Sequence, residues 1–86
     1  MDNQHKKITG YRDLSQEEVD LMNEIKAIEA QVADLHKRVT SYQQSNVLIE
    51  SSQRQDAARN LAIARNELQT GFMWFVRGIA LPVNNW

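Results

Sequence analysis

Two long stretches of this chain place apolar residues alternately three and four positions apart, the spacing that gives an α-helix one apolar side. The first stretch comprises Leu21, Ile25, Ile28, Val32, Leu35, Val39 and Tyr42. This spacing, kept over three heptads, predicts an a/d seam. The helix that carries it would be about 40 Å long and needs a second long helix to cover its seam.

A capping box marks the point where this first helix begins. The Ser15 hydroxyl can accept a hydrogen bond from the Glu18 amide, while the Glu18 side chain reaches back to the Ser15 amide. Acidic residues in the first turn also suit the positive end of a helix. We therefore expect an N-terminal flap, irregular or with a short helix, over residues 1–14 and the first helix over about 16–45.

The chain is expected to reverse within residues 43–55, which are rich in Ser, Gln and Asn. Ser52 and Gln55 repeat the spacing of a capping box, so the second helix would begin near Gln53. The alternative is that the first helix continues to Glu50 with a kink, because no proline marks the corner. The sequence leaves both alternatives open.

The second stretch begins with small apolar residues and ends with large ones. Its expected seam consists of Ala57, Leu61, Ala64, Leu68, Phe72 (or Gly71) and Phe75, and Pro82 ends the pattern. A helix over about 53–81 would pair with the first helix, closely near the turn and more widely near the chain termini. The expected fold class is therefore all-α, a single domain over residues 1–86 that forms a tapered antiparallel two-helix hairpin.

Residues 72–86 contain four of the six aromatic residues of the chain. Large apolar side chains lie on every side of this part of the second helix, and Trp74 points away from the expected seam. One neighbouring helix covers only one stripe, and an exposed tryptophan beside Phe and Met would form a costly apolar patch. At 86 residues the chain is also near the size at which a lone core is marginal. We expect a homo-oligomer.

Composition narrows the classes of function. The chain has no cysteine, which excludes disulfides and thiolate metal sites, and His5 and His36 lie too far apart to suggest a metal site. The net charge of −1 at pH 7 argues against binding DNA or RNA polymers by neutralising many phosphates, although a local basic pocket is compatible with it. The polar N-terminus and the lack of an apolar run of roughly 18 residues predict a soluble, cytosolic protein without a membrane segment.

No arrangement of catalytic residues is recognisable along the chain. It has no Gly-rich phosphate loop, no His-Glu-x-x-His helix and no thiol nucleophile. The acidic residues of the first helix lie off the apolar seam and are expected to form a solvated face. We therefore expect neither an enzyme nor a cofactor.

Two residues near the N-terminus are candidates for ligand binding. Tyr11 lies between Gly10 and Arg12 in a polar tail, so its ring could stack on a nucleobase while Arg12 supplies charge. The alternative is that Tyr11 packs on the hairpin as an anchor. Lys26 either contacts a phosphate near Tyr11 or is a solvated lysine paired with Glu29, an exposed contact of little energy.

One flank of the second helix mixes hydrogen-bond donors with apolar groups. Its members are Arg59, Ile63, Asn66, Thr70, Met73 and Arg77. An ordinary helix flank would explain this pattern. The same flank would also suit a subunit contact that lines a polar pocket.

Short motifs occur in order at the two ends of the chain. They are Ile8-Thr-Gly-Tyr-Arg-Asp-Leu-Ser-Gln-Glu-Glu18, Leu21-Met-Asn-Glu-Ile-Lys26, and Leu61-Ala-Ile-Ala-Arg65 followed by Gln69-Thr-Gly-Phe-Met73 and Arg77-Gly-Ile-Ala80. Together they resemble the phage-encoded helical-hairpin sponges that counter the bacterial CBASS immune system. The resemblance leaves out the middle of the chain, and Gly78 departs from it, because alanine is usual there.

This resemblance implies a protein that sequesters cyclic dinucleotide and trinucleotide messengers in the host bacterial cytoplasm without cleaving them. It also implies a compact homo-oligomer, a hexamer of interlocked hairpins. In such sponges a tyrosine of a Gly-Tyr motif stacks on a base and a lysine early in the first helix meets the phosphates; Tyr11, after Gly10, and Lys26 match those positions. For a separate trinucleotide site, the mixed flank offers the candidates Arg59, Asn66 and Thr70.

The competing hypothesis is a structural or adaptor module, a coiled-coil hairpin whose aromatic end binds another protein. The heptad seam supports it, because any helical hairpin would have one. This hypothesis predicts no affinity for nucleotides and little effect of changing Tyr11 or Lys26.

Overall fold

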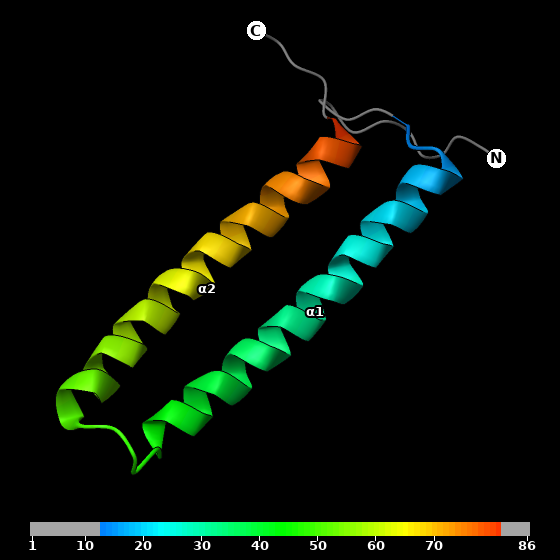
Figure 1. Ribbon diagram of the computed structural model, residues 1–86. Coiled ribbons are helices and arrows are strands. Elements are labelled where there is room, and N and C mark those ends of the chain that lie inside the picture. Colours follow the sequence, from blue (N-terminus) through cyan, green and yellow to red (C-terminus); the bar gives the residue numbers. More distant parts are fainter. Residues whose placement is uncertain (1–12, 82–86) are drawn as a thin grey trace, which may run out of the picture.

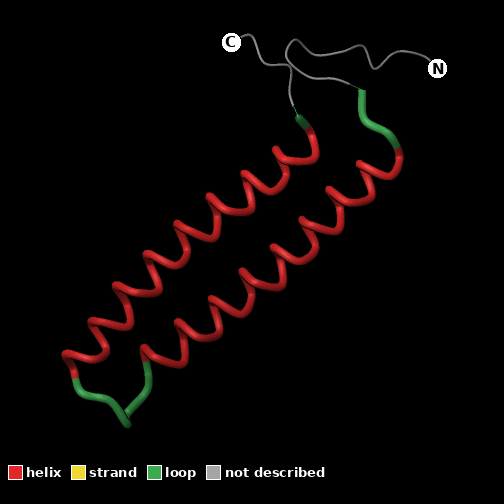
Figure 2. The backbone as a smooth tube through the Cα atoms, turned by 45° about the horizontal axis from the view of Figure 1, so that its top comes forward, coloured by secondary structure: helices red, strands yellow, loops and turns green. Residues whose placement is uncertain are grey.

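The computed structural model describes residues 13–81 and forms an antiparallel helical hairpin over them (Figure 1). Helix α1 covers Gln16–Gln44 and helix α2 covers Ser51–Ala80, and the views in Figures 1 and 2 both place the two helices side by side. The radius of gyration is 18.8 Å, whereas a compact domain of this length has about 12 Å. The expected all-α hairpin is confirmed, and its shape is long and thin.

The start of α1 is the capping box that the sequence predicts. The Glu18 amide donates to Ser15 Oγ at 3.1 Å, and the Ser15 amide donates to Glu18 Oε1 at 2.9 Å. These bonds satisfy amides that the first turn of a helix leaves without partners. The flap expected over residues 1–14 lies almost entirely outside the described residues.

The turn differs from the expectation in two ways. Helix α1 ends at Gln44, so the alternative of a kinked extension to Glu50 is wrong. Helix α2 begins at Ser51, and its capping box joins Glu50 to Gln53, where the Glu50 amide donates to Gln53 Oε1 at 2.9 Å. The box expected at Ser52 is therefore wrong by two residues, because glutamate can also serve as the N-cap when its backbone is extended.

Side chains on both sides of the turn hold it together. The Leu48 amide donates to Asn46 Oδ1 at 2.9 Å, and Asn46 Nδ2 donates to Gln43 Oε1 at 2.9 Å. The Arg54 guanidinium donates to the carbonyl oxygen of Asn46. Asn46 thus connects both helices to the loop between them.

The seam of α1 is rotated from the one expected. Of the residues described, only Ile25 is a buried apolar residue, with 8% of its surface exposed. The half-buried residues beside it are Met22, Glu29, Val32, His36, Thr40 and Gln43, whereas Leu21, Ile28, Leu35, Val39 and Tyr42 are exposed. The apolar side chains of α1 form an arc around the helix, and α2 covers only one edge of this arc. The a/d pattern predicts where the arc lies but not which of its edges the partner helix covers. We call the four exposed residues spaced by seven, Leu21, Ile28, Leu35 and Tyr42, the outer stripe.

The seam of α2 agrees with the expectation except at its C-terminal end. Ala57, Leu61, Ala64 and Phe72 are half-buried, while Leu68 is 40% exposed. Phe75 was expected in the seam but is 59% exposed, and Val76 takes its place. From Leu68 the seam continues in four-residue steps through Phe72 to Val76, and Phe75 therefore lies outside it.

A histidine fixes the register of the two helices. His36 Nε2 lies 2.7 Å from the carbonyl oxygen of Leu61, and because a carbonyl oxygen only accepts, this nitrogen is the donor. Both residues are half-buried in the seam. Because the helices are antiparallel, residues whose numbers add up to about 97 lie at the same level along the hairpin.

Candidate functional site

The candidates from the N-terminal motif divide at the boundary of the described residues. Gly10, Tyr11 and Arg12 lie outside them. Lys26 lies in the third turn of α1 with its side chain exposed. Within residues 13–81 no ion pair joins Lys26 to Glu29, so Lys26 is a solvated lysine here, and its contact with a phosphate stays a prediction. The Lys26 ammonium is therefore available to a ligand.

Arg59, Asn66 and Thr70 are all exposed on α2. Arg59 Nη2 donates to Asp56 Oδ1 at 2.5 Å, but both side chains remain about three-fifths exposed, so the pair adds little stability and leaves Arg59 free to exchange partners. Eleven residues separate Arg59 from Thr70, which is about 16 Å along the helix. The three side chains are therefore spread along α2 and do not converge on a single point.

The register separates the candidates along the hairpin. Lys26 lies at the level of about residue 71 and thus close to the level of Thr70, in the terminal half. Arg59 lies at the level of about residue 38, toward the turn. Lys26, a candidate for phosphate contact, and Arg59, at the turn end of the mixed flank, therefore lie at different levels along the hairpin.

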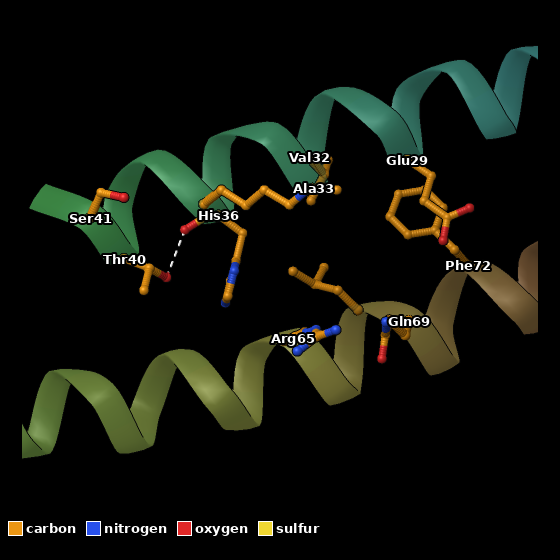
Figure 3. Close-up of a pocket in the computed structure, with 11 residues that line it drawn as sticks. Glu29, Val32, Ala33, His36, Thr40, Ser41, Arg65, Gln69 and Phe72 are labelled. Carbon is orange, nitrogen blue, oxygen red and sulfur yellow. Dashed lines mark hydrogen bonds between the residues drawn. The ribbon is translucent and has the colours of Figure 1, made fainter. Parts of the chain in front are cut away.

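A cleft that sequence analysis missed lies between the two helices (Figure 3). It has a volume of about 680 Å³ and is lined by Glu29, Val32, Ala33, His36, Lys37, Thr40, Ser41, Arg65, Leu68, Gln69 and Phe72. Its residues come from positions about thirty apart in the chain, so no spacing within one helix could indicate it. In the sequence, only the four-residue spacing of Arg65 and Gln69 indicates that these two polar residues share one side of α2.

Polar and apolar groups divide the cleft into two ends. Figure 3 shows His36, Thr40 and Ser41 at one end, Arg65 near the middle, and Glu29 beside the Phe72 ring at the other end. Thr40 Oγ1 donates to the carbonyl oxygen of His36 at 2.8 Å, shown as a dashed line. The cleft thus offers hydrogen-bonding side chains toward one end, the Arg65 cation near the middle, and an aromatic face with one carboxylate at the other end.

Some cationic side chains of the described segment form ion pairs and others do not. Arg38 Nε donates to Asp34 Oδ2 at 2.9 Å, and Arg59 pairs with Asp56. Among residues 13–81, neither Lys37 nor Arg65 forms an ion pair, although both line the cleft. An anion that entered the cleft would therefore meet cations that have no carboxylate partner.

Large apolar side chains remain uncovered near the end of α2. Met73, Trp74 and Phe75 are each more than half exposed, and we call them the terminal cluster. The guanidinium carbon of Arg77 lies 5.8 Å from the centroid of the Trp74 ring, and Phe75 stacks on Phe72 with ring centroids 6.4 Å apart. These contacts cover little of the cluster, which leaves a surface suited to another protein chain.

The described segment also bears on the membrane and metal expectations. None of its helices is both long enough and apolar enough to cross a membrane. Within the same residues no group of three or more His, Cys, Asp or Glu side chains is arranged to hold a metal ion.

Comparison with known proteins connects the whole hairpin to one family. Residues 3–80 match the model of the Acb2/Tad1 hairpin domain. A protein of Pseudomonas phage JBD67, Anti-CBASS protein 2, is 34% identical in an alignment that covers 95% of this chain and 97% of the phage protein. The similarity thus extends across the middle of the chain, which the short motifs left out.

Proposed function

This chain belongs to the Acb2/Tad1 hairpin family, and we propose that it sequesters cyclic dinucleotide and trinucleotide messengers and so blocks CBASS immunity. The observation that carries the proposal is the similarity along nearly the full length of both chains to a phage protein named for its action against CBASS. The messengers are held and not cleaved. The protein acts in the cytoplasm of the host bacterium, where these messengers are made.

Tyr11 and Lys26 are the proposed contacts for a cyclic dinucleotide. The Tyr11 ring stacks on a base, Gly10 lets the backbone approach the ligand, and Arg12 and Lys26 meet the phosphates. The exposed Lys26 side chain without an ion pair to Glu29 supports its part in this proposal. In a symmetric pocket between two subunits each contact would occur twice, which matches a ligand with two bases and two phosphates.

Arg59, Asn66 and Thr70 are the proposed contacts for a cyclic trinucleotide. Their line of about 16 Å along α2 is long enough to meet several phosphates or base edges of a larger ring. The Asp56 carboxylate that Arg59 contacts is exposed and easily replaced by a phosphate.

A homo-oligomer, a hexamer of interlocked hairpins, is part of this proposal. The outer stripe and the terminal cluster are the surfaces that the subunits would cover. The long, thin shape supports this arrangement, since one hairpin of 18.8 Å radius of gyration buries few of its own apolar side chains.

The test is calorimetric titration of the purified protein with a panel of cyclic dinucleotides and trinucleotides, followed by chromatography of the released ligand. We expect tight binding and recovery of intact ligand. Tyr11→Ala and Lys26→Ala should each weaken dinucleotide binding by roughly a hundredfold, since each removes a stacked ring or a charged contact twice per ligand. Arg38→Ala, which changes an exposed cation elsewhere on α1 that does not line the cleft, is the control and should bind normally.

The adaptor hypothesis predicts different results. The terminal cluster supports it, because Met73, Trp74 and Phe75 are each more than half exposed at the aromatic end that would bind another protein. Under that hypothesis no cyclic nucleotide binds, and both N-terminal variants behave like the original protein. Release of a hydrolysed ligand would contradict sequestration in favour of catalysis.

A further inference from the structure

We propose that the cleft between α1 and α2 is a separate site for a nucleoside monophosphate with an amino-bearing base. This site uses none of the residues assigned above to the cyclic messengers. It lies within one hairpin and takes a phosphomonoester, whereas cyclic oligonucleotides carry phosphodiesters. The proposal therefore stands or falls independently of sequestration.

Lys37 and Arg65 supply the cations of the phosphate part of the site, with Arg65 near the middle of the cleft and Lys37 next to His36 on α1. They come from opposite helices, line the same cleft, and have no ion pair within the described part of the chain. An anion bound between the helices would interact favourably with both cations. A phosphomonoester carries between one and two negative charges near neutral pH, which balances two cations better than the single charge of a diester.

The Glu29 carboxylate lies toward the end of the cleft away from Lys37. Eight residues separate Glu29 from Lys37, about 12 Å along α1. Figure 3 shows Glu29 beside the Phe72 ring, at the end opposite His36 and Ser41. The charges in the cleft are therefore arranged along its length, with the acid at one end.

Phe72 and Glu29 define the base end of the site. The half-buried Phe72 ring offers an apolar wall for a planar base, and Leu68 and Val32 extend that wall. The Glu29 carboxylate beside it accepts hydrogen bonds only, so it favours a base with an exocyclic amino group. Cytosine, adenine and guanine have this group, and uracil lacks it.

The remaining polar groups of the cleft agree with this orientation. His36 donates to the Leu61 carbonyl and is committed to holding the helices together. Ser41 supplies a neutral donor at the end of the cleft beside His36, whereas Gln69 lies toward the Phe72 end, where its amide can meet the sugar or the base. The volume of about 680 Å³ is within the range of roughly 300–1,000 Å³ that is typical of small-molecule sites.

The experiment is titration of the full-length protein with 5′-CMP, 5′-UMP, 5′-AMP and adenosine 3′,5′-cyclic monophosphate, followed by NMR shifts. We expect 5′-CMP to bind several-fold more tightly than 5′-UMP, and 5′-AMP more tightly than its cyclic diester. Lys37→Gln and Arg65→Gln should each weaken 5′-AMP binding roughly tenfold or more, since each removes a charged hydrogen bond to the phosphate. Circular dichroism checks that each variant is folded.

Two further variants test which residues are responsible. Arg38→Gln changes an exposed arginine next to Lys37 that does not line the cleft, and it should leave 5′-AMP binding unchanged. Glu29→Ala should reduce the preference for 5′-CMP over 5′-UMP, because it removes the acceptor for the amino group. This ratio would not change if Glu29 only stabilised the helix.

Three outcomes would overturn the proposal. One is no binding of 5′-AMP or 5′-CMP at concentrations up to about 5 mM. Another is an equal loss in Arg38→Gln, which would indicate general attraction of an anion. The third is loss of monophosphate binding in Tyr11→Ala with normal binding in Arg65→Gln, which would place the ligand in the cyclic dinucleotide site.

Discussion

At the turn end of the hairpin the chain satisfies its own polar groups, whereas at the terminal end it leaves large aromatic rings uncovered. Asn46 bonds to Gln43 and Leu48, and the Arg54 guanidinium donates to its carbonyl oxygen. Near the other end, Trp74 and Phe75 are 58% and 59% exposed. Hydrogen bonds within one chain can set the shape of a turn, but covering aromatic surface takes a larger area than this hairpin has.

This difference indicates a division of roles along the molecule. The turn end determines that the chain folds back. We expect the terminal end, which carries the terminal cluster and lies at the level of Lys26, to determine what the hairpin associates with. Changes at the two ends should therefore affect different measurements.

The largest effect is expected from a charge in the terminal cluster. Trp74→Glu should convert the proposed homo-oligomer to monomers, because a buried unpaired carboxylate in a subunit contact is strongly unfavourable. Light scattering after size-exclusion chromatography measures the mass. Leu48→Glu, which places the same charge on an exposed apolar residue of the turn, is the control and should leave the mass unchanged. Dissociation by Leu48→Glu alone would reverse the assignment of roles.

The next effect is expected in the seam. Ile25→Ala should lower the free energy of unfolding by about 2–3 kcal/mol, because Ile25 is buried against α2. Ile28→Ala removes the same atoms from the outer stripe and should cost about 1 kcal/mol in a lone hairpin, since half of that side chain is exposed. Denaturation at one fixed protein concentration compares them. Equal losses would mean that a second chain covers the outer stripe.

A smaller effect is expected at the turn. Asn46→Ala removes the side chain that bonds to Gln43 and Leu48 and should lower the free energy of unfolding by about 1 kcal/mol. Thermal unfolding followed by circular dichroism measures this change. The oligomeric mass should remain that of the original protein, and a lower mass would show that the turn also takes part in assembly.

The smallest effect is expected at Gly78. A Cβ atom at this position meets nothing within 4 Å, and glycine inside a helix costs roughly 0.5–1 kcal/mol relative to alanine. Gly78→Ala should therefore raise the free energy of unfolding by about that amount, with Gly71→Ala as a second helical glycine that has the same open space. Gain of stability with loss of assembly would show that a subunit approaches the Gly78 backbone closely.

Much of the fold follows from local pattern, whereas most of the site does not. The three- and four-residue spacing predicts two long helices, and the Ser15 box marks the start of the first at the correct residue. The turn is less predictable, because several polar residues of the segment suit a helix cap equally well. The rotation of α1 is not predictable from one chain, because both edges of its apolar arc are equally suited to a partner.

The sequence by itself determined two amphipathic helices, the reversal between them and an excess of apolar side chains near the C-terminus, since each depends on residue types at short spacing. The tertiary structure decided which edge of α1 faces α2, that His36 binds the Leu61 carbonyl, and that Lys37 and Arg65 share a cleft with Phe72. Those features join positions about thirty residues apart. Their contact depends on the rotation and register of one helix on the other, which spacing within either helix does not contain.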